Sequence, residues 1–298
     1  MTLTVCFDAL GTCFTLADII QAVEEQYGRD LVGAGWGVKG FVNDWFHSCQ
    51  RDYTYLSLIS PPPPAIASIL KTNLPLSLSA ALNIPPPSPS SLEAITSLLA
   101  SLPPAPTLRD TFKLLSESGN AKLVIVTNGA KETTEGYADK ADVKQYVETV
   151  LSCDQIGLAK PHKEVYEAAN KACDALEGGQ GDERWFVAAH IWDLAAAKEA
   201  GFRTALVLSD PPSEVVQDDK ENAQLQSLFE LYGGRPDLVA PTLLELAQKI
   251  LARSQIVSAS NESLSKFDAD LKPDAEDGPQ LTGEEGEMPP DRATLLVI

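Results

Sequence analysis

Apolar residues in this chain follow two different repeats. From Leu3 to Phe7 the residues are mostly apolar and partly β-branched, which is typical of a strand buried on both faces of a parallel sheet. After a turn at Gly11, apolar residues recur at helical spacing over 15–28 and 40–59, and further helical segments lie between proline clusters at 65–73 and 91–102. Residues 15 to about 105 are therefore predicted to be wholly helical.

The rest of the chain alternates strands with helices. A helix over 107–118, with Thr107 as N-cap and Gly119 at its end, leads into an apolar strand at 122–128. Strands at 148–153, 185–189 and 203–208 follow in turn with helices at 163–176 and 194–201, and a last strand and helix fall within 237–251. Such alternation predicts βαβ units, so the expected fold is α/β with a doubly wound parallel sheet.

Composition narrows the choice of partners. The 298 residues carry a formal net charge of -19, which argues against nucleic-acid binding because that requires clustered Lys and Arg. Five cysteines without a CxxC pair suggest reduced thiols in a cytoplasmic protein, and no apolar window is long enough to span a membrane. We expect a small-molecule substrate and no membrane partner, and leave a homodimer open.

Polar residues follow the predicted strands where each one ends. Ligands of open α/β sheets bind at the carboxyl ends of the strands, so these residues are expected to converge on one crevice. They are Asp8, Thr12, Thr127, Asn128, Lys160 and Asp193. Each has a plainer interpretation when taken alone: Asp8 as a turn acid before Gly11, Lys160 as a surface lysine, and Asp193 as the N-cap of the helix at 194–201.

Taken in order, the segments Asp8-Ala-Leu-Gly-Thr12, Thr127-Asn128-Gly129, Lys160-Pro161 and the Asp193 segment resemble the four motifs of the haloacid dehalogenase superfamily of hydrolases. The resemblance spans roughly the first 250 residues. It implies a Rossmann-like hydrolase core formed by 1–14 and 106–252, with an inserted helical cap domain at 15–105. Residues 253–298 are acidic and poor in apolar residues, and are expected to form a disordered tail.

Two positions separate this chain from the magnesium phosphatases of that superfamily. Their first motif is DxD, whose second acid is Leu10 here, and an acid expected four residues before Asp193 is Ala189. An apolar Leu10 cannot protonate a leaving alkoxide, and the missing acid weakens an oxygen-rich metal site. The segments "DALGT", "IWD", "KPHKEVY" and "QRDYTYL" instead resemble the 2-haloacid dehalogenase branch, which implies chemistry with no metal and no cofactor.

That resemblance implies a role for each candidate residue. Asp8 attacks the halogen-bearing carbon to form an ester, Lys160 holds Asp8 ionised, and Asp193 fixes Lys160 and helps to activate the hydrolytic water. The expected substrate-binding residues are Leu10, Thr12, Thr127, Asn128, His47 and His190. Thr12 and Thr127 are expected to donate hydrogen bonds to the nucleophile or to the substrate carboxylate.

Two of these residues depart from the branch. His47 aligns with a cap arginine that receives the halide, and Ala188 and His190 stand where the fourth motif has Ser and Asn. An altered leaving-group pocket leaves two alternatives open. One is a phosphatase of the same superfamily that uses Mg²⁺, and the other is a non-catalytic binding protein on this fold.

Overall fold

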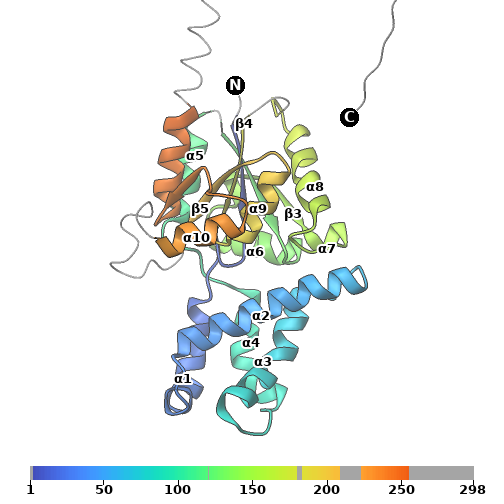
Figure 1. Ribbon diagram of the computed structural model, residues 1–298, viewed down its shortest axis with the longest axis vertical. Coiled ribbons are helices and arrows are strands. Elements are labelled where there is room, and N and C mark those ends of the chain that lie inside the picture. The colour runs from blue at the N-terminus through green and yellow to red at the C-terminus, as the bar shows by residue number, and fades with distance from the viewer. Residues whose placement is uncertain (1–2, 120, 180–182, 209–222, 255–298) are drawn as a thin grey trace, which may run out of the picture. The chain divides into compact units, whose positions relative to one another are not determined.

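A computed structural model describes residues 3–119, 121–179, 183–208 and 223–254 (Figure 1). The tail predicted from residue 253 onward lies outside these ranges except for its first two residues. Within the described ranges, none of the helices combines the length and the apolar character needed to cross a bilayer.

Six parallel strands form a single sheet in the order β3-β2-β1-β4-β5-β6. They are β1 (Leu3–Asp8), β2 (Ala121–Thr127), β3 (Val147–Ser152), β4 (Glu183–Ala188), β5 (Arg203–Val207) and β6 (Leu238–Ala240). The strand order reverses between β1 and β4, so the crevice of this doubly wound sheet opens at their carboxyl ends. The predicted α/β fold with a doubly wound parallel sheet is confirmed.

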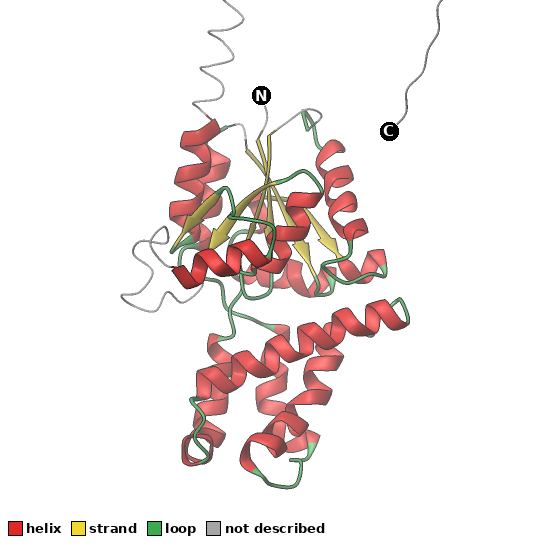
Figure 2. Ribbon diagram, viewed as in Figure 1, coloured by secondary structure: helices red, strands yellow, loops and turns green. Residues whose placement is uncertain are grey.

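Helices cover both faces of the sheet (Figure 2). One face packs on α5 (Leu108–Glu117), α6 (Lys131–Lys140) and a helix at 243–254, and the other on α8 (Lys163–Asp174), α9 (Ile191–Glu199) and α10 (Ala223–Leu231). Successive side chains of β1 point to opposite faces: the ring of Phe7 lies 4.8 Å from that of Phe112 in α5, whereas Cys6 faces Cys173 of α8. Burial on both faces explains why β1 is apolar at nearly every position.

Between β1 and α5 the described chain is helical, and we call the helices between Ala17 and Ala100 the cap. They are α1 (Ala17–Gly33), α2 (Val38–Ile59), α3 (Ile66–Leu82), η1 (Pro89–Leu92), α4 (Glu93–Thr96) and η2 (Ser97–Ala100). The predicted boundaries between core and cap remain a prediction.

Two local predictions differ from the structure. Helix α3 runs through Pro75 to Leu82, well past its predicted end at residue 73. Proline removes one backbone hydrogen bond, but Leu70, Leu74 and Leu78 form a buried stripe across it, and that packing holds the helix together. Helix α6 was not predicted, because its sequence KETTEGYADK is polar and contains a glycine.

Candidate active site

Asp8 ends β1 at the crevice where the strand order reverses. The chain then turns sharply: the backbone N–H groups of Cys13 and Phe14 both donate to the carbonyl of Ala9, at 3.0 and 2.9 Å. Gly11 has φ +83°, and a Cβ atom there would lie 3.0 Å from Cε1 of His190. Glycine is therefore required here for two reasons: the backbone is left-handed, and a Cβ atom would be too close to the imidazole of His190.

The turn brings Thr12 back onto the carboxylate of Asp8. The Thr12 hydroxyl donates to Asp8 Oδ2 at 2.6 Å and accepts from the backbone N–H of Ala189 at 2.9 Å. Because the second bond fixes the oxygen, the first fixes the orientation of the carboxylate. The interpretation of Asp8 as a turn acid alone does not account for these contacts.

Lys160 lies between the two acids of the site. Its ammonium is 2.9 Å from Asp8 Oδ1 and 2.9 Å from Asp193 Oδ2, and its side chain is fully buried. The backbone of Lys160 is fixed as well, since its N–H donates to Asn128 Oδ1 at 3.0 Å and its carbonyl accepts from Thr54 Oγ1 of α2 at 2.9 Å. The surface-lysine interpretation is wrong.

Asp193 is also fully buried, and both of its oxygens have donors. Lys160 contacts Oδ2, and the hydroxyl of Tyr166 donates to Oδ1. Helix α9 begins at Ile191 with His190 as N-cap, so the interpretation of Asp193 as an N-cap is wrong. Sequence reasoning assigned no role to Tyr166, although the "KPHKEVY" segment that contains it was noted.

The three charges set one another's protonation. Burial alone would raise the pKa of Asp8, but the Lys160 ammonium, with His190 and Thr12, outweighs it and holds that pKa below its usual value. Burial raises the pKa of Asp193, and Lys160 opposes this effect. Burial would lower the pKa of Lys160, but the carboxylates of Asp193 and Asp8 raise it above its usual value. Asp8 and Lys160 are therefore ionised at neutral pH.

Two more predicted site residues, Thr127 and Asn128, lie at the end of β2, and their side chains accept hydrogen bonds from backbone N–H groups. Thr127 is fully buried, and its hydroxyl accepts from the backbone N–H of Gly129 at 2.9 Å. Asn128 uses its side-chain oxygen to hold the backbone of Lys160. Neither shows a hydrogen bond to Asp8 within the described residues, so both shape the loops around the nucleophile.

The remaining predicted residues line the cap side of the site. His190 Nδ1 lies 3.6 Å from Asp8 Oδ2, and its ring is 5.6 Å from that of His47 in α2 and 5.4 Å from that of Trp192. Partial burial and the neighbouring His190 lower the pKa of His47, so its imidazole is mainly neutral at neutral pH.

Leu10 is buried and lines a small cavity of about 50 Å³. Its other walls include Phe46 and Leu70 of the cap and Gly129 and Tyr137 of the core. The cavity is therefore mostly apolar, and lies where cap and core meet beside the turn after Asp8.

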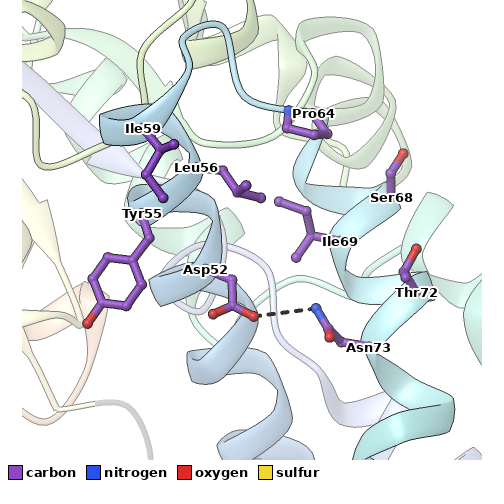
Figure 3. A pocket seen from close by; sticks show the side chains of 9 residues that line it. All are labelled: Asp52, Tyr55, Leu56, Ile59, Pro64, Ser68, Ile69, Thr72 and Asn73. Carbon is purple, nitrogen blue, oxygen red and sulfur yellow. Dashed lines mark hydrogen bonds between the residues drawn. The ribbon is translucent and has the colours of Figure 1, made fainter.

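A larger groove of about 430 Å³ lies elsewhere, between α2 and α3 of the cap (Figure 3). Its lining includes one carboxylate, that of Asp52, which accepts from Asn73 Nδ2 at 3.5 Å. The residues that line it include no lysine, histidine or cysteine. Its size does not make it the reaction site, because it lacks a nucleophile paired with a cation or base.

Comparison with known proteins identifies the family. The model of a family described as haloacid dehalogenase-like hydrolase matches residues 3–201. The chain belongs to the haloacid dehalogenase-like hydrolases. The match runs from the start of β1 to just past the end of α9, so it spans the positions of all the predicted site residues.

Sequence identity to individual relatives is low. The (S)-2-haloacid dehalogenase of Xanthobacter autotrophicus is 25% identical over 260 residues, which cover 84% of this chain and 95% of that protein. Haloacetate dehalogenase H-2 of a Moraxella species is 24% identical over 68% of this chain and 84% of its own length. A solved structure of the Xanthobacter L-2-haloacid dehalogenase with covalently bound chloropropionic acid gives a TM-score of 0.64 at 22% identity, covering 83% of this chain and 98% of that one. The last comparison shows a shared fold.

Proposed function

We propose that this hydrolase is a metal-independent 2-haloacid dehalogenase that acts through an ester on Asp8. The observation that carries the proposal is the Lys160 ammonium, held 2.9 Å from both Asp8 and Asp193 in a buried site. A cation in that position keeps the nucleophilic carboxylate ionised without a metal. The names of the relatives, which are dehalogenases of small 2-haloacids, support the same reaction.

In the first step, an Asp8 oxygen forms a bond to C2 of the haloacid while the carbon–halogen bond breaks and halide leaves. The bond to Thr12 and the ion pair with Lys160 hold the carboxylate in one orientation, which lowers the entropic part of the barrier. In the second step, water attacks Cγ of Asp8, the ester opens, and a 2-hydroxy acid leaves.

The cavity lined by Leu10 supports a small substrate. A space of about 50 Å³ accommodates an apolar group of one or two carbons, and its walls are mostly apolar. We infer that Leu10 and Phe46 contact the short alkyl arm of the substrate. Thr127, Asn128, His47 and His190 complete the proposed surroundings of the substrate.

The residues do not fit the magnesium site of a phosphatase. Leu10 and Ala189 replace two acids of that site, and the ammonium of Lys160 already lies between the two carboxylates that are present. No cluster of three or more potential metal ligands occurs among the described residues. We therefore assign no step to a metal, and we place the enzyme in the cytoplasm, where its five free cysteines would stay reduced.

The test is to supply 2-chloropropionate and, separately, an aryl phosphate, each with and without EDTA. We expect halide release that survives EDTA and is lost in Asp8→Asn, together with an ester on Asp8 detectable by mass spectrometry after rapid acid quench. Asp110→Asn, at an exposed position of α5, is the matched control and should retain activity. Phosphate release that requires magnesium would instead establish the phosphatase alternative, and a lack of both activities would contradict the enzyme assignment.

A further inference from the structure

One face of helix α2 contacts the core loop that carries Lys160. This loop, residues 157–162, directly precedes α8. Thr54 and Ser57 are three positions apart in α2, so their side chains lie next to each other on one side of the helix. Both side chains form hydrogen bonds with the loop. The cap therefore reaches the segment of the core that bears the cation of the site.

The two hydrogen bonds end on consecutive residues of the loop. The Thr54 hydroxyl donates to the carbonyl of Lys160 at 2.9 Å, and the Ser57 hydroxyl accepts from the backbone N–H of Ala159 at 3.0 Å. Ser57 is 1% exposed and Ala159 is 0% exposed, so water is excluded from the second bond. A buried N–H that loses its acceptor carries a free-energy cost, and the loop would have to shift to recover a partner.

The core holds the same residue from its other sides. Asn128 Oδ1 accepts from the backbone N–H of Lys160 at 3.0 Å, and the Lys160 ammonium lies 2.9 Å from Asp8 and from Asp193. The carbonyl of Lys160 and the peptide N–H before it are the groups bonded to the cap. The backbone position from which the Lys160 side chain extends is thus set jointly by core and cap.

The Thr54 hydroxyl is not needed to hold α2 together. Its oxygen also lies 3.2 Å from the carbonyl of Gln50, one turn earlier in the same helix, but that carbonyl can accept the ordinary backbone bond of the helix as well. Removal of the hydroxyl should therefore cost the helix little. Its main effect should fall on the carbonyl of Lys160, which loses a donor from the cap.

We propose that Thr54 and Ser57 are positioning residues for Lys160, a role that rests on the proposed dehalogenase function. By holding the peptide bond before Lys160 and the carbonyl after it, they keep the ammonium on the carboxylate of Asp8. Both act through Lys160 and not on the substrate. The cap accordingly takes part in activating the nucleophile, in addition to forming one wall of the small apolar cavity.

The ionisation of Asp8 reports where the ammonium lies. Burial raises the pKa of Asp8, and the charge of Lys160 is the largest of the influences that oppose this effect. A displaced ammonium should therefore raise the pKa of Asp8, and since only the carboxylate attacks, the reaction should become more sensitive to acid. The other titratable groups that face this pair in the described residues stay the same in the variants below: Cys13, Cys153, Tyr166, His190 and Asp193.

The test uses two double variants that each remove two hydroxyls. The cap variant is Thr54→Val with Ser57→Ala. The control variant is Thr111→Val with Ser118→Ala, whose hydroxyls donate at 2.7 and 2.6 Å to carbonyls of the preceding turn at α5. With excess 2-chloropropionate, the first phase of halide release, in which one ester forms per active site, should slow by about 10- to 100-fold in the cap variant, because misplacement by about 1 Å can cost this much. The control variant should react at close to the wild-type rate.

The pH profile separates positioning from a general structural defect. The rate of the cap variant relative to wild type should fall further as the pH is lowered from 7 to 4, because its Asp8 becomes protonated at a higher pH. A fraction of misfolded protein would lower the rate by the same factor at every pH at which circular dichroism shows the variant folded. Thr54→Ser, which keeps the hydroxyl, should have nearly the wild-type rate and profile, whereas Thr54→Val alone should not.

Each outcome decides the inference. If the cap variant reacts as fast as the control variant, or more slowly but with the wild-type pH profile, Thr54 and Ser57 do not position Lys160, and the proposed function stands as long as the wild type releases halide. If the wild type releases no halide and forms no ester, the proposed function fails by itself. Titration of the Asp8 carboxyl carbon by ¹³C NMR then still tests the contact: a raised pKa in the cap variant supports it, and an unchanged one overturns it.

Discussion

The two sides of the site are built in different ways. On the core side, Asp8, Lys160, Asp193 and Tyr166 are at most 5% exposed, and they form a continuous chain of hydrogen bonds. On the cap side, His47 and His190 touch through ring contacts only, and Nδ1 of His190 has no hydrogen-bond partner in the described structure. Substitutions on the core side should be costly in stability, because each buried charge depends on another. Substitutions on the cap side should cost little.

The largest effect is expected when the central cation of the core side is removed. Lys160→Met leaves two carboxylates facing each other without compensation, which should lower the free energy of unfolding by about 3–5 kcal/mol and abolish halide release. Urea unfolding and a halide assay measure the two effects. Lys163→Met is the control, because its ion pair with Glu167 is exposed and screened by water, so its loss should change stability little. Equal losses in the two variants would contradict the contrast between buried and exposed pairs.

A smaller effect is expected at Tyr166, the last residue in the series of hydrogen bonds that begins at Asp8. Tyr166→Phe removes the donor to Asp193 Oδ1 and should cost about 1–3 kcal/mol of stability, since a buried acceptor loses its partner. The matched change Tyr55→Phe, at an exposed position of α2, should alter the free energy of unfolding by no more than about 0.5 kcal/mol. A neutral result for Tyr166→Phe would mean that Asp193 finds another donor.

Acid provides a test of the Asp8 ion pair. Because the pKa of Asp8 is lowered on folding, its ionised form contributes stability that is fully present above its ordinary value of 3.8 and is lost as pH falls through the lower folded value. The difference in unfolding free energy between wild type and Asp8→Asn should therefore be constant from pH 6 to 5. Below about pH 4 the wild type should lose stability relative to Asp8→Asn, by at most about 1.4 kcal/mol per pH unit. The raised pKa of Asp193 is caused mainly by burial, which both proteins share, so its titration contributes less to this difference. A difference that stays constant down to pH 2 would contradict the ion pair.

The smallest effect is expected on the cap side. His47→Arg replaces a largely neutral imidazole by a permanent cation and should speed the first halide phase several-fold, with stability changed by less than about 0.5 kcal/mol. His47→Gln is the control for the loss of the ring. Stopped-flow detection of proton or halide release measures the rate, and equal rates in the two variants would exclude a role for charge at this position.

The difference between the two sides also sets what sequence reasoning could find. Asp8, Asn128 and Lys160 follow predicted strands in the sequence. Because a parallel sheet brings the carboxyl ends of its strands to one edge, the sequence predicted that these residues lie close together. The apolar run of β1 and the alternation of strands and helices predicted the sheet and its class. These features depend on local pattern and on a general rule of topology.

Local pattern failed where packing between distant segments overrides it. Pro75 disfavours a helix, whereas Leu70, Leu74 and Leu78 have helical spacing, and only the burial of this stripe in the cap decides that α3 continues. The role of Tyr166 was also missed, because a tyrosine on the apolar face of an amphipathic helix has the pattern of a packing residue.

The sequence by itself determined the order of strands and helices, the family and the identity of the nucleophile candidate. Only the tertiary structure decided that Lys160 lies between acids 152 and 33 residues away, that each oxygen of Asp193 accepts a hydrogen bond, and that Nδ1 of His190 has no hydrogen-bond partner among the described residues. The physical reason is that periodicity encodes which face of an element is buried, whereas hydrogen-bond partners across the crevice depend on distances between segments that no local pattern records.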